Sequence, residues 1–353
     1  MRKLAQYLGL TGEKPVPDFE IPLLPEDLLR LKGFLTSRFW NREAIPTTEV
    51  WDKYSTVCET SFYWDNGKLW YKDIVHGLDK QFPNLFGYKR TQSIGQELKR
   101  WLLKRLGAWH GPLLFSAQSS FKKGALSFDD LKKHFNGIVS FGPYLAGSYY
   151  NDIAQAMQSA GKKQVDAVIE IGPGSGKLLS LIKKHHPECK IAIVDLPTSM
   201  VFSFSYLKTL FPDSSYSLPH EAEPVSNCQS LKDINFYTPE QIEYIPTDCF
   251  DIGVNTASFG EMRKEVIDEY FSLLRRVFKQ NNIFYCNNRI EKIMSYDGME
   301  IPIRFTEYPW LSSDVDYIYN VCKFRERTSI LPFFKKATKL HVSHDGHTKV
   351  WNE

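Results

Sequence analysis

The sequence predicts an α/β fold with a parallel sheet, and three observations support this prediction. The apolar run 167–171 is rich in β-branched residues and suits a strand buried on both faces of a sheet. A glycine-rich turn and a helical pattern over residues 177–186 follow it, and Pro187 ends the helix. A second apolar run, 191–194, then ends at Asp195. In a right-handed strand–helix–strand unit these strand ends border a ligand crevice.

Two known nucleotide-binding patterns do not fit the glycine turn. The phosphate loop G-x-x-x-x-G-K-[ST] would need glycine in place of Ile171 and serine or threonine in place of Leu178. The dinucleotide pattern G-x-G-x-x-G would need glycine in place of Lys177. Its first strand also usually lies near the start of a domain, whereas this strand begins after a long preceding region.

A third pattern, E-x-G-x-G-x-G followed by a downstream acid, is complete. It consists of Glu170, Gly172, Gly174, Gly176 and Asp195. Glycines allow the backbone to turn sharply and to approach a ligand. A carboxylate at the end of the second strand can accept hydrogen bonds from both hydroxyls of a ribose.

The chain continues with the alternation expected of such a fold. Strands are predicted at 234–237, 250–255 and 282–286, and helices at 152–161, 198–210 and 265–279. Thr198 or Ser199 is expected to cap the helix at 198–210. Asn255 and Thr256 end the strand at 250–255, so we expect them in the same crevice as the glycine turn.

Four segments together resemble a known family: residues 148–151, 170–176, 194–197 and 255–262. They are similar to the sugar O-methyltransferases of bacterial surface-polysaccharide clusters, which belong to the class I, Rossmann-like methyltransferases. The resemblance covers about residues 145–330. The glycine motif is common to the whole superfamily, whereas Val-Asp-Leu-Pro and Asn-Thr-x-Ser-Phe-x-Glu-Met are narrower signals.

The resemblance implies S-adenosylmethionine as the cofactor. The residues it places around that cofactor are Tyr150, Glu170, Gly172, Gly174, Gly176, Asp195, Leu196, Tyr237, Asn255 and Thr256. For two of them an alternative stays open. Tyr150 either closes the site over the methionine part or is a buried structural tyrosine. Tyr237, or its neighbour Phe236, either stacks on the adenine or is an ordinary strand aromatic.

The implied reaction is methyl transfer to a sugar hydroxyl, which needs a base to take the hydroxyl proton. Our candidate base is Glu261; the alternative is that it anchors the following helix or orients Ser258. Three histidines of the first half, His76, His110 and His134, are rival bases. Candidate acceptor-binding residues are Ser258, Arg289, Arg304 and Trp310. Two other functions stay open: a methyltransferase for a non-sugar small molecule, and a non-catalytic binding subunit with the same fold.

Residues 1–145 are predicted to form a mainly helical N-terminal extension, followed by a methyltransferase domain at 146–353. Its expected helices lie at 23–40, 47–58, 94–109 and 128–135. In similar enzymes such an extension builds an acceptor pocket or a contact in a homo-oligomer. The basic amphipathic helix 94–109 either touches a membrane surface or packs on the body with a solvated face.

The C-terminal part is expected to supply a final antiparallel pair of strands. Candidates are a strand at 315–324 and a hairpin of 337–343 and 348–351, with Asp345-Gly346 as its turn. The nearby histidines recur at spacings that put His341 and His344 on opposite sides of a strand. We therefore expect no metal site.

Composition narrows the class of protein further. A net charge of +3 argues against a dedicated nucleic-acid binder. The chain has no run of eighteen apolar residues and no signal peptide, so we expect a cytoplasmic protein with no membrane span. Its six cysteines form no C-x-x-C pair and suit neither a zinc site nor a disulfide scaffold, as in a reducing compartment.

Overall fold

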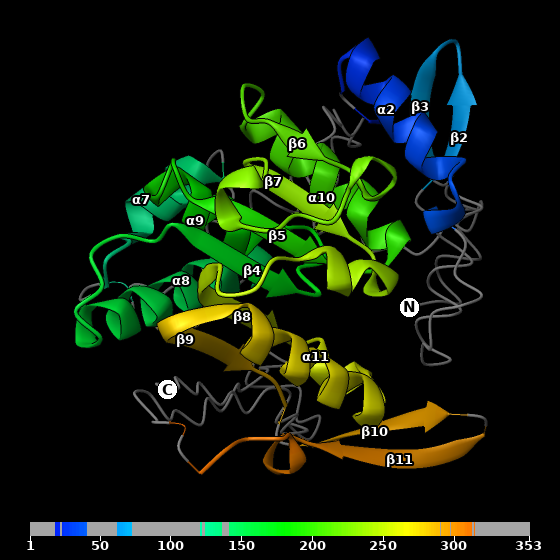
Figure 1. Cartoon of the computed structure of the whole chain (residues 1–353). Coiled ribbons are helices and arrows are strands. Elements are labelled where there is room, and N and C mark those ends of the chain that lie inside the picture. The colour runs from blue at the N-terminus through cyan, green and yellow to red at the C-terminus, as the bar shows by residue number, and fades with distance from the viewer. Residues whose placement is uncertain are drawn as a thin grey trace, which may run out of the picture.

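A parallel sheet of six strands forms the centre of the molecule. The computed structural model describes residues 18–21, 23–40, 62–72, 121, 124–135, 141–289, 291–296, 298–312 and 314. The strand order is β6-β7-β5-β4-β8-β9, and every neighbouring pair is parallel (Figure 1). The strands are β4 (Ala167–Ile171), β5 (Lys190–Val194), β6 (Tyr216–Ser217), β7 (Ile234–Tyr237), β8 (Phe250–Thr256) and β9 (Phe278–Asn287).

The order of these strands reverses at one point. From β4 the chain moves outward through β5 to the edge strand β6 and back to β7, and it then places β8 on the other side of β4. The carboxyl ends of β4 and β8 therefore form a topological switch point, where ligands bind in open α/β sheets. The predicted α/β, Rossmann-like fold is confirmed.

Helices cover both faces of the sheet and enclose two apolar cores. One face packs against α8 (Phe141–Ser159), α9 (Lys177–His185) and α10 (Pro197–Leu210). The other packs against α11 (Lys264–Val277). Successive residues of a strand point to opposite faces, so Val168 lies in the first core and Ile169 in the second. This double burial explains the continuous apolar runs of β4 and β5.

Several element boundaries differ from the sequence-based prediction. α8 begins at Phe141 and not at Asp152, so the segment 148–151 lies inside the helix and α8 crosses the predicted domain boundary at 145–146. Pro143 falls in its first turn, where a missing N–H breaks no helical hydrogen bond. The predicted cap of α10 by Thr198 or Ser199 is wrong, because Leu196 occupies the N-cap position, without a side-chain hydrogen bond, and Pro197 is the first helical residue. β9 begins four residues early, at Phe278.

The described part of the N-terminal region contains a small sheet as well as helices. β1 (Asp18–Glu20), β3 (Lys68–Lys72) and β2 (Phe62–Asp65) form an antiparallel sheet beside α2 (Pro25–Leu35) and η1 (Arg38–Trp40). Further along the chain, α7 (Phe128–His134) confirms the predicted helix at 128–135. The predicted helices at 47–58 and 94–109 lie outside the described residues.

Helix α2 is attached to the main body through the segment that follows β6. The Arg30 guanidinium donates to both carboxylate oxygens of Glu221 in η2 (Pro219–Glu221), at 2.8 and 2.6 Å. It also donates to the carbonyl oxygen of Tyr216, at 2.9 Å. A planar fork of this kind fixes orientation as well as proximity. The N-terminal region is thus joined to the β6 edge of the sheet.

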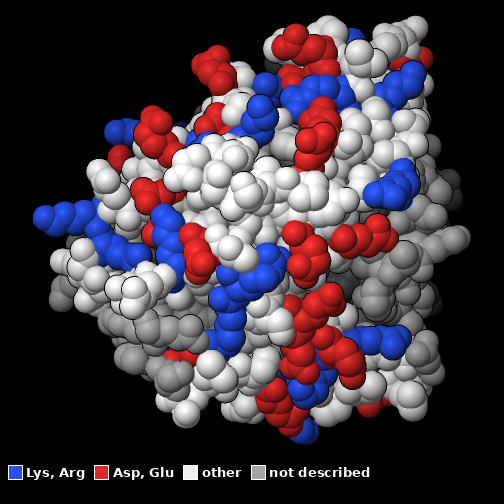
Figure 2. Space-filling model, in the orientation of Figure 1, with Lys and Arg blue, Asp and Glu red and all other residues white. Residues whose placement is uncertain are grey.

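A β-hairpin that the sequence analysis did not predict follows β9. It consists of β10 (Glu291–Tyr296) and β11 (Met299–Arg304), and η6 (Phe305–Glu307) continues from it. The hairpin packs on η5 (Phe259–Glu261), just after β8. Figure 2 shows acidic and basic side chains interspersed on one face, with acidic ones gathered over α11 and this hairpin. The strands predicted at 315–324, 337–343 and 348–351 lie outside the described residues.

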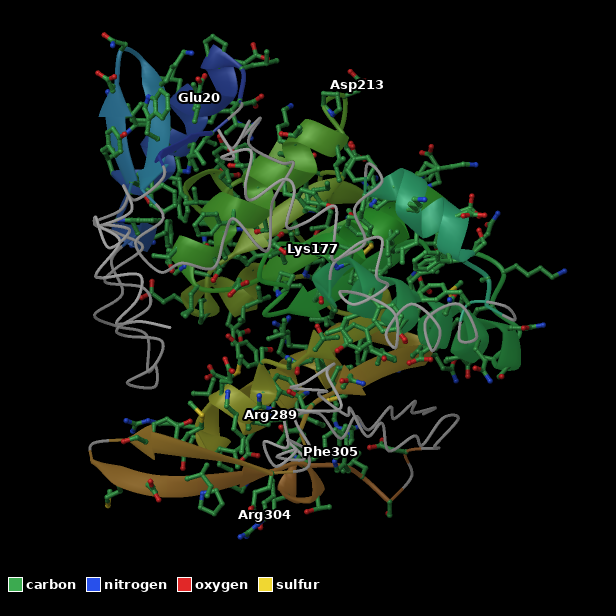
Figure 3. All side chains as sticks on the ribbon, turned by 180° about the vertical axis from the view of Figure 1, so that it is seen from behind. Glu20, Lys177, Asp213, Arg289, Arg304 and Phe305 are labelled. Atoms are coloured by element: carbon green, nitrogen blue, oxygen red, sulfur yellow. A yellow bond between two sulfur atoms is a disulfide. The ribbon has the colours of Figure 1, made fainter. Side chains whose placement is uncertain are left out.

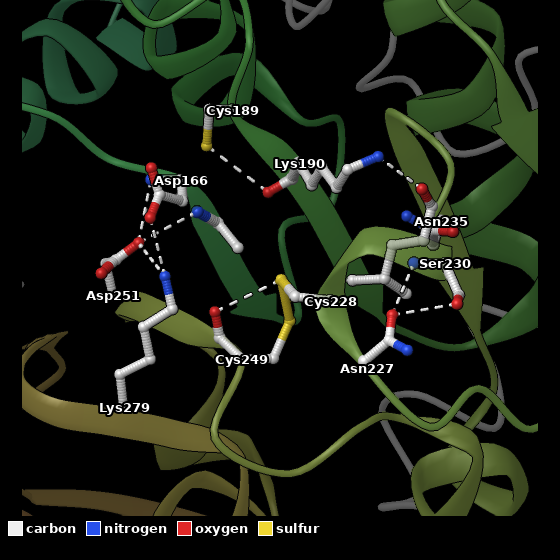
Figure 4. The surroundings of a disulfide bond; sticks show 12 residues. Asp166, Cys189, Lys190, Asn227, Cys228, Ser230, Asn235, Cys249, Asp251 and Lys279 are labelled. Carbon is white, nitrogen blue, oxygen red and sulfur yellow. Dashed lines mark hydrogen bonds and ion pairs between the residues drawn. A yellow bond between two sulfur atoms is a disulfide. The ribbon is translucent and has the colours of Figure 1, made fainter.

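One prediction about the cysteines is wrong. Cys228, in η3 (Cys228–Ser230), forms a disulfide with Cys249, the residue before β8 (Figure 4). Spacing in the sequence gave no sign of this bond because the two cysteines are brought together by the return of the chain from β7 to β8. Cys189 and Cys286 are buried free thiols.

In the part of the chain that the structure describes, no helix combines the length and the apolar content that a membrane span would need.

Candidate functional site

The carboxyl ends of β4, β5 and β8 meet around the glycine turn. The amide of Gly172 donates to the carbonyl oxygen of Val194 at 2.8 Å, which joins the turn to the end of β5. Ile171 stands opposite Asn255 in the pairing of β4 with β8. The three strand ends that the sequence analysis grouped are therefore neighbours.

The three glycines of the turn have positive φ angles, and two of them serve different purposes. A Cβ atom at Gly172, where φ is +68°, would lie 2.5 Å from the Oγ of Ser258. Gly172 is thus required both by its backbone conformation and by the close approach of another loop. At Gly174, where φ is +57°, a Cβ would meet nothing within 4 Å. The turn is closed on the Gly172 side and open at Gly174.

Asp195 is fixed to this turn by hydrogen bonds. Its Oδ2 accepts from the amide of Gly174 at 3.1 Å, and its Oδ1 accepts from the amide of Leu196 at 2.7 Å. Burial raises the pKa of the Asp195 carboxyl to about 7, although these amides and Ser199 favour the charged form. Asp195, Leu196 and the glycine turn form a single structural unit.

Glu170 places a second carboxyl beside Asp195. Its side chain is 1% exposed, and Oε2 has no hydrogen-bond partner among the described residues. Burial, and then the charge of Asp195, raise the pKa of Glu170 to about 8, while a hydrogen bond with the Thr256 side chain opposes them. A buried oxygen without a donor is unfavourable, so it is a natural point for a ligand donor.

Ser258 packs against the glycine turn and is hydrogen-bonded to it. Asn255, which is completely buried, donates through Nδ2 to the carbonyl oxygen of Ile171 at 3.0 Å and to the Oγ of Ser258 at 2.5 Å. Ser258 donates in turn to the same carbonyl at 3.2 Å. The structure therefore ties Ser258 to the glycine turn, although the sequence analysis assigned it to the acceptor.

Glu261 lies at the end of η5 and contacts the unpredicted hairpin. Its carboxylate forms a close ion pair with the ammonium group of Lys292 on β10. Both side chains are partly exposed, at 23% for Glu261 and 20% for Lys292. The carboxylate is thus held in a defined position near the crevice and stays accessible. Lys292 is a site residue that the sequence analysis missed because it had not predicted β10.

Tyr150 lies away from the glycine turn. Helices α8 and α9 run side by side in the same direction: Gly142 lies next to Lys177, and Tyr150 packs on the ring of His185, with centroids 4.8 Å apart. Lys177, labelled in Figure 3, begins α9 at the turn, whereas His185 ends it about 12 Å away along the helix. The structure thus gives Tyr150 a packing position.

The candidate histidine that the structure describes is also held by packing. His134 contacts the Oγ of Ser180 on α9 through Nε2 at 2.8 Å. Burial, with smaller effects of Lys184 and His185, lowers its pKa to about 4. His134, the last residue of α7, therefore lies against α9 and not with Glu261. His76 and His110 lie outside the described residues.

The aromatics at the end of β7 are buried in the two cores. Phe236 is 0% exposed in the core beneath α10, and Tyr237 is 2% exposed in the core beneath α11. The Tyr237 carbonyl oxygen accepts from the amide of Asp195 at 3.3 Å. The contact of Tyr237 with the site is therefore through its backbone.

Of the three remaining acceptor candidates, two have partners within the hairpin region. Arg304 pairs with Glu291 at 2.6 Å and with Glu307 at 2.9 Å, and it points away from the body (Figure 3). The Trp310 indole donates to the Phe305 carbonyl oxygen at 3.0 Å and belongs to an aromatic cluster over α11. Arg289 follows the end of β9, is half-buried, and forms no ion pair with another described residue.

The described ranges contain no group of three or more histidine, cysteine, aspartate or glutamate side chains arranged to hold a metal ion.

The fold and this site define a class of protein: an open α/β sheet with a glycine turn and a buried acid at its switch point, where such sheets bind ligands. No protein-family model matches the chain, and no curated protein matches it. Among solved structures, the plantazolicin methyltransferase BpumL in complex with S-adenosylhomocysteine matches at 17% identity and a TM-score of 0.31. The match covers 49% of this chain and 56% of that one.

Two further solved structures are similar at the same level. An S-adenosylmethionine-dependent methyltransferase from Geobacter sulfurreducens matches at 12% identity and a TM-score of 0.28, over 41% of this chain and 49% of that one. Phosphoethanolamine N-methyltransferase 2 from Haemonchus contortus matches at 14% identity and a TM-score of 0.29. This match covers 50% of this chain and 39% of that one. Because these scores are low, the fold assignment depends on the strand order and not on the neighbours.

Proposed function

We propose that this chain is an S-adenosylmethionine-dependent O-methyltransferase. The observation that supports this most strongly is the union of Asp195 with the glycine turn at the end of β5. An acid bound to the amide of Gly174 leaves its remaining acceptor capacity for ribose hydroxyls. The turn departs from both the phosphate-loop and the dinucleotide patterns, so a nucleoside without pyrophosphate fits it better.

The residues around the turn fit this cofactor. The open space at Gly174 admits a ligand, and Asp195 would hold its ribose. The orphaned Oε2 of Glu170 would accept a hydrogen bond from a bound donor. When bound, the cofactor supplies a methyl group on a sulfonium, which leaves as a neutral thioether. The protein must then align an acceptor oxygen and remove its proton.

Glu261 is the carboxylate that we propose as the general base. It ends η5, the short helix that comes after β8, is partly exposed, and is oriented by Lys292. A carboxylate fixed in this way can accept the hydroxyl proton as the oxygen attacks. Arg289, at the end of the neighbouring strand β9, would contact the acceptor.

The acceptor is proposed from the narrower motifs at 194–197 and 255–262. They favour a sugar hydroxyl of a bacterial surface glycan, or of its nucleotide- or lipid-linked precursor. A non-sugar small molecule is the alternative acceptor, and a binding subunit without catalysis is the alternative class. Cytoplasmic location, a homo-oligomer, and the absence of nucleic-acid partners remain part of this proposal.

The test is methyl transfer to a defined glycan fraction. Surface glycans from a strain that lacks the gene would be incubated with the protein and S-adenosylmethionine carrying a tritiated methyl group. The proposal predicts that label enters the glycans. Label in small molecules alone would favour the alternative acceptor.

The Glu261→Gln variant tests the role of the base in the same assay. We expect turnover to fall about 10²- to 10⁴-fold, the usual contribution of general acid–base catalysis, with the affinity for S-adenosylhomocysteine nearly unchanged. Glu265→Gln, four residues on and exposed at the start of α11, is the matched control and should keep full activity. Full activity of Glu261→Gln would remove Glu261 as the base.

A further inference from the structure

Two buried amides connect the glycine turn to the loop that carries Glu261. Asn288 follows β9 and is 1% exposed. Its Nδ2 donates to the Oδ1 of Asn255 at 2.7 Å and to the Sγ of Cys286 at 3.3 Å. Its Oδ1 accepts from the amide of Gly260 at 3.2 Å. The side chain therefore joins strands β8 and β9 to η5.

Asn255 completes the connection on the other side. Its Nδ2 reaches the carbonyl of Ile171, the residue before Gly172, and its Oδ1 also accepts from the amide of Phe259 at 3.3 Å. Both N–H donors of each amide are thus used. Since a buried amide left unpaired is unfavourable, the arrangement has little freedom to change one part alone.

The ends of this chain of hydrogen bonds are significant. One end is the carbonyl oxygen of Ile171, the residue before the first glycine of the turn. The other end is the amide N–H of Gly260, the residue before Glu261. The loop between them contains Ala257 at a φ of +58°, a conformation that a residue with a side chain adopts only where its surroundings hold it. The amide of Ala257 donates to the carbonyl oxygen of Asn287 at 2.8 Å.

We propose that Asn288 is a positioning residue that couples occupancy of the glycine turn to the placement of Glu261, through Asn255. This inference depends on the proposed function, because it needs a ligand in the turn and a role for Glu261. A ligand that orders the turn orders the carbonyl of Ile171, then Asn255 and Asn288, and so the N–H groups of η5. The base is thereby set when the cofactor is bound.

Hydrogen exchange of the η5 amides tests this coupling without an acceptor. The amides of Phe259 and Gly260 are the ones bonded to Asn255 and Asn288, so their exchange reports on the network. Adding S-adenosylhomocysteine to the whole chain should slow their exchange by about fivefold or more, the lower end of typical coupling between sites. In Asn288→Ala this ligand-dependent slowing should disappear, while calorimetry shows that the ligand still binds.

Asn282→Ala is the matched control. Asn282 is a buried asparagine of β9, 5% exposed, whose amide donates to the carbonyl oxygen of Lys279 at the end of the strand far from Asn288. If the substitutions only loosened the structure around β9, both variants should lose the ligand-dependent slowing of hydrogen exchange. The coupling predicts that only Asn288→Ala loses it. If Asn288→Ala does not fold, Asn288→Asp decides, because its carboxylate can accept from Gly260 but cannot donate to Asn255.

Two results would overturn the inference. Ligand-dependent slowing that is equal in the wild type and in the Asn288 variants would show that Asn288 couples nothing. Slowing that is lost equally in Asn282→Ala would show a general loosening of β9. Failure of the proposed function looks different, because the wild type would then give no heat of binding with S-adenosylhomocysteine.

Discussion

Two neighbouring carboxyls with raised pKa values distinguish the crevice at the scale of single residues. Glu170 and Asp195 end adjacent strands and are both removed from water, which disfavours their charged forms. The charge of Asp195 further disfavours the charged form of Glu170. Such pairs are typical of ligand sites, where a bound group supplies the missing hydrogen bonds. Here the orphaned Oε2 of Glu170 is the clearest sign of that.

The raised pKa of Glu170 predicts a pH-dependent stability. Its pKa is about 8 in the folded chain, against 4.5 for an ordinary glutamate, so the folded state binds more protons between these values. Stability from this group is therefore full below about pH 4.5 and is lost as the pH rises to about 8. In Glu170→Gln the loss is absent, so the variant should gain stability relative to the wild type as the pH rises.

Urea unfolding at pH 5, 6.5 and 8 measures this difference. Glu265→Gln, an exposed position, controls for the removal of a carboxylate as such. A constant difference between Glu170→Gln and the wild type across this range would contradict the burial that we assign to Glu170.

At the scale of elements, the glycine turn depends on a contact between two loops. Gly172→Ala would place a Cβ 2.5 Å from the Oγ of Ser258 in a backbone of positive φ. The left-handed backbone alone costs about 1–2 kcal/mol for a residue with a side chain. The clash adds to this cost and shifts the turn, so we expect both lower stability and weaker binding of S-adenosylhomocysteine.

Gly298→Ala provides the comparison. Its φ of +77° carries the same backbone cost, but its Cβ would meet nothing within 4 Å, in the turn between β10 and β11. It should lose stability by the backbone cost alone and keep its affinity, as measured by thermal unfolding and calorimetry. Equal affinities for the two variants would argue against the packing of Ser258 under the turn.

The sequence predicted the elements whose pattern is local. β7 matches its predicted range, and β4, β5 and α9 differ by at most one residue, because buried runs and helical spacing are visible in short windows. The positions of the glycines, Asp195 and Asn255 around one crevice followed from the order of the elements. These parts needed only the parallel topology.

What depends on distant contacts was not predicted. The β10–β11 hairpin has exposed residues on both strands and no strong alternation, so its pairing partner decides its structure. Lys292 and Asn288 were missed with it. The one available signal was a pair of asparagines, 287 and 288, at the end of a buried strand. Tyr150 was predicted near the cofactor, but it lies inside α8, which begins earlier than its pattern indicated, and it packs on His185.

At the scale of the whole molecule, the two ends of the parallel strands have separate roles. The carboxyl ends form the crevice. The amino ends hold structural bonds, which are the Cys228–Cys249 disulfide and the ion pairs of Lys279 with Asp166 and Asp251 (Figure 4). Cys249 and Asn255 lie at opposite ends of β8, about 20 Å apart along the strand. We therefore expect substitutions at the amino ends of the strands to leave the crevice at the carboxyl ends intact.

Reduction of the disulfide tests this separation. The bond closes a loop of 21 residues, so its loss should cost about 3 kcal/mol of stability. Thermal unfolding with and without dithiothreitol should show this loss, while the affinity for S-adenosylhomocysteine stays the same. The double variant Cys228→Ser/Cys249→Ser should match the reduced wild type and not respond to the reductant. A large loss of affinity on reduction would show that the two ends of the strands are not independent.

We propose that Asp195 and the glycine turn bind the nucleoside of S-adenosylmethionine, and calorimetric titration with S-adenosylhomocysteine measures this binding. We expect the wild type to bind one molecule per chain. Asp195→Ala should weaken binding by about 10- to 100-fold, from charge-assisted hydrogen bonds of about 1.5–3 kcal/mol. Asp213→Ala, at an exposed position of the loop after α10, should bind as the wild type does. A wild type that gives no heat, or an Asp195→Ala variant with unchanged affinity, would contradict it.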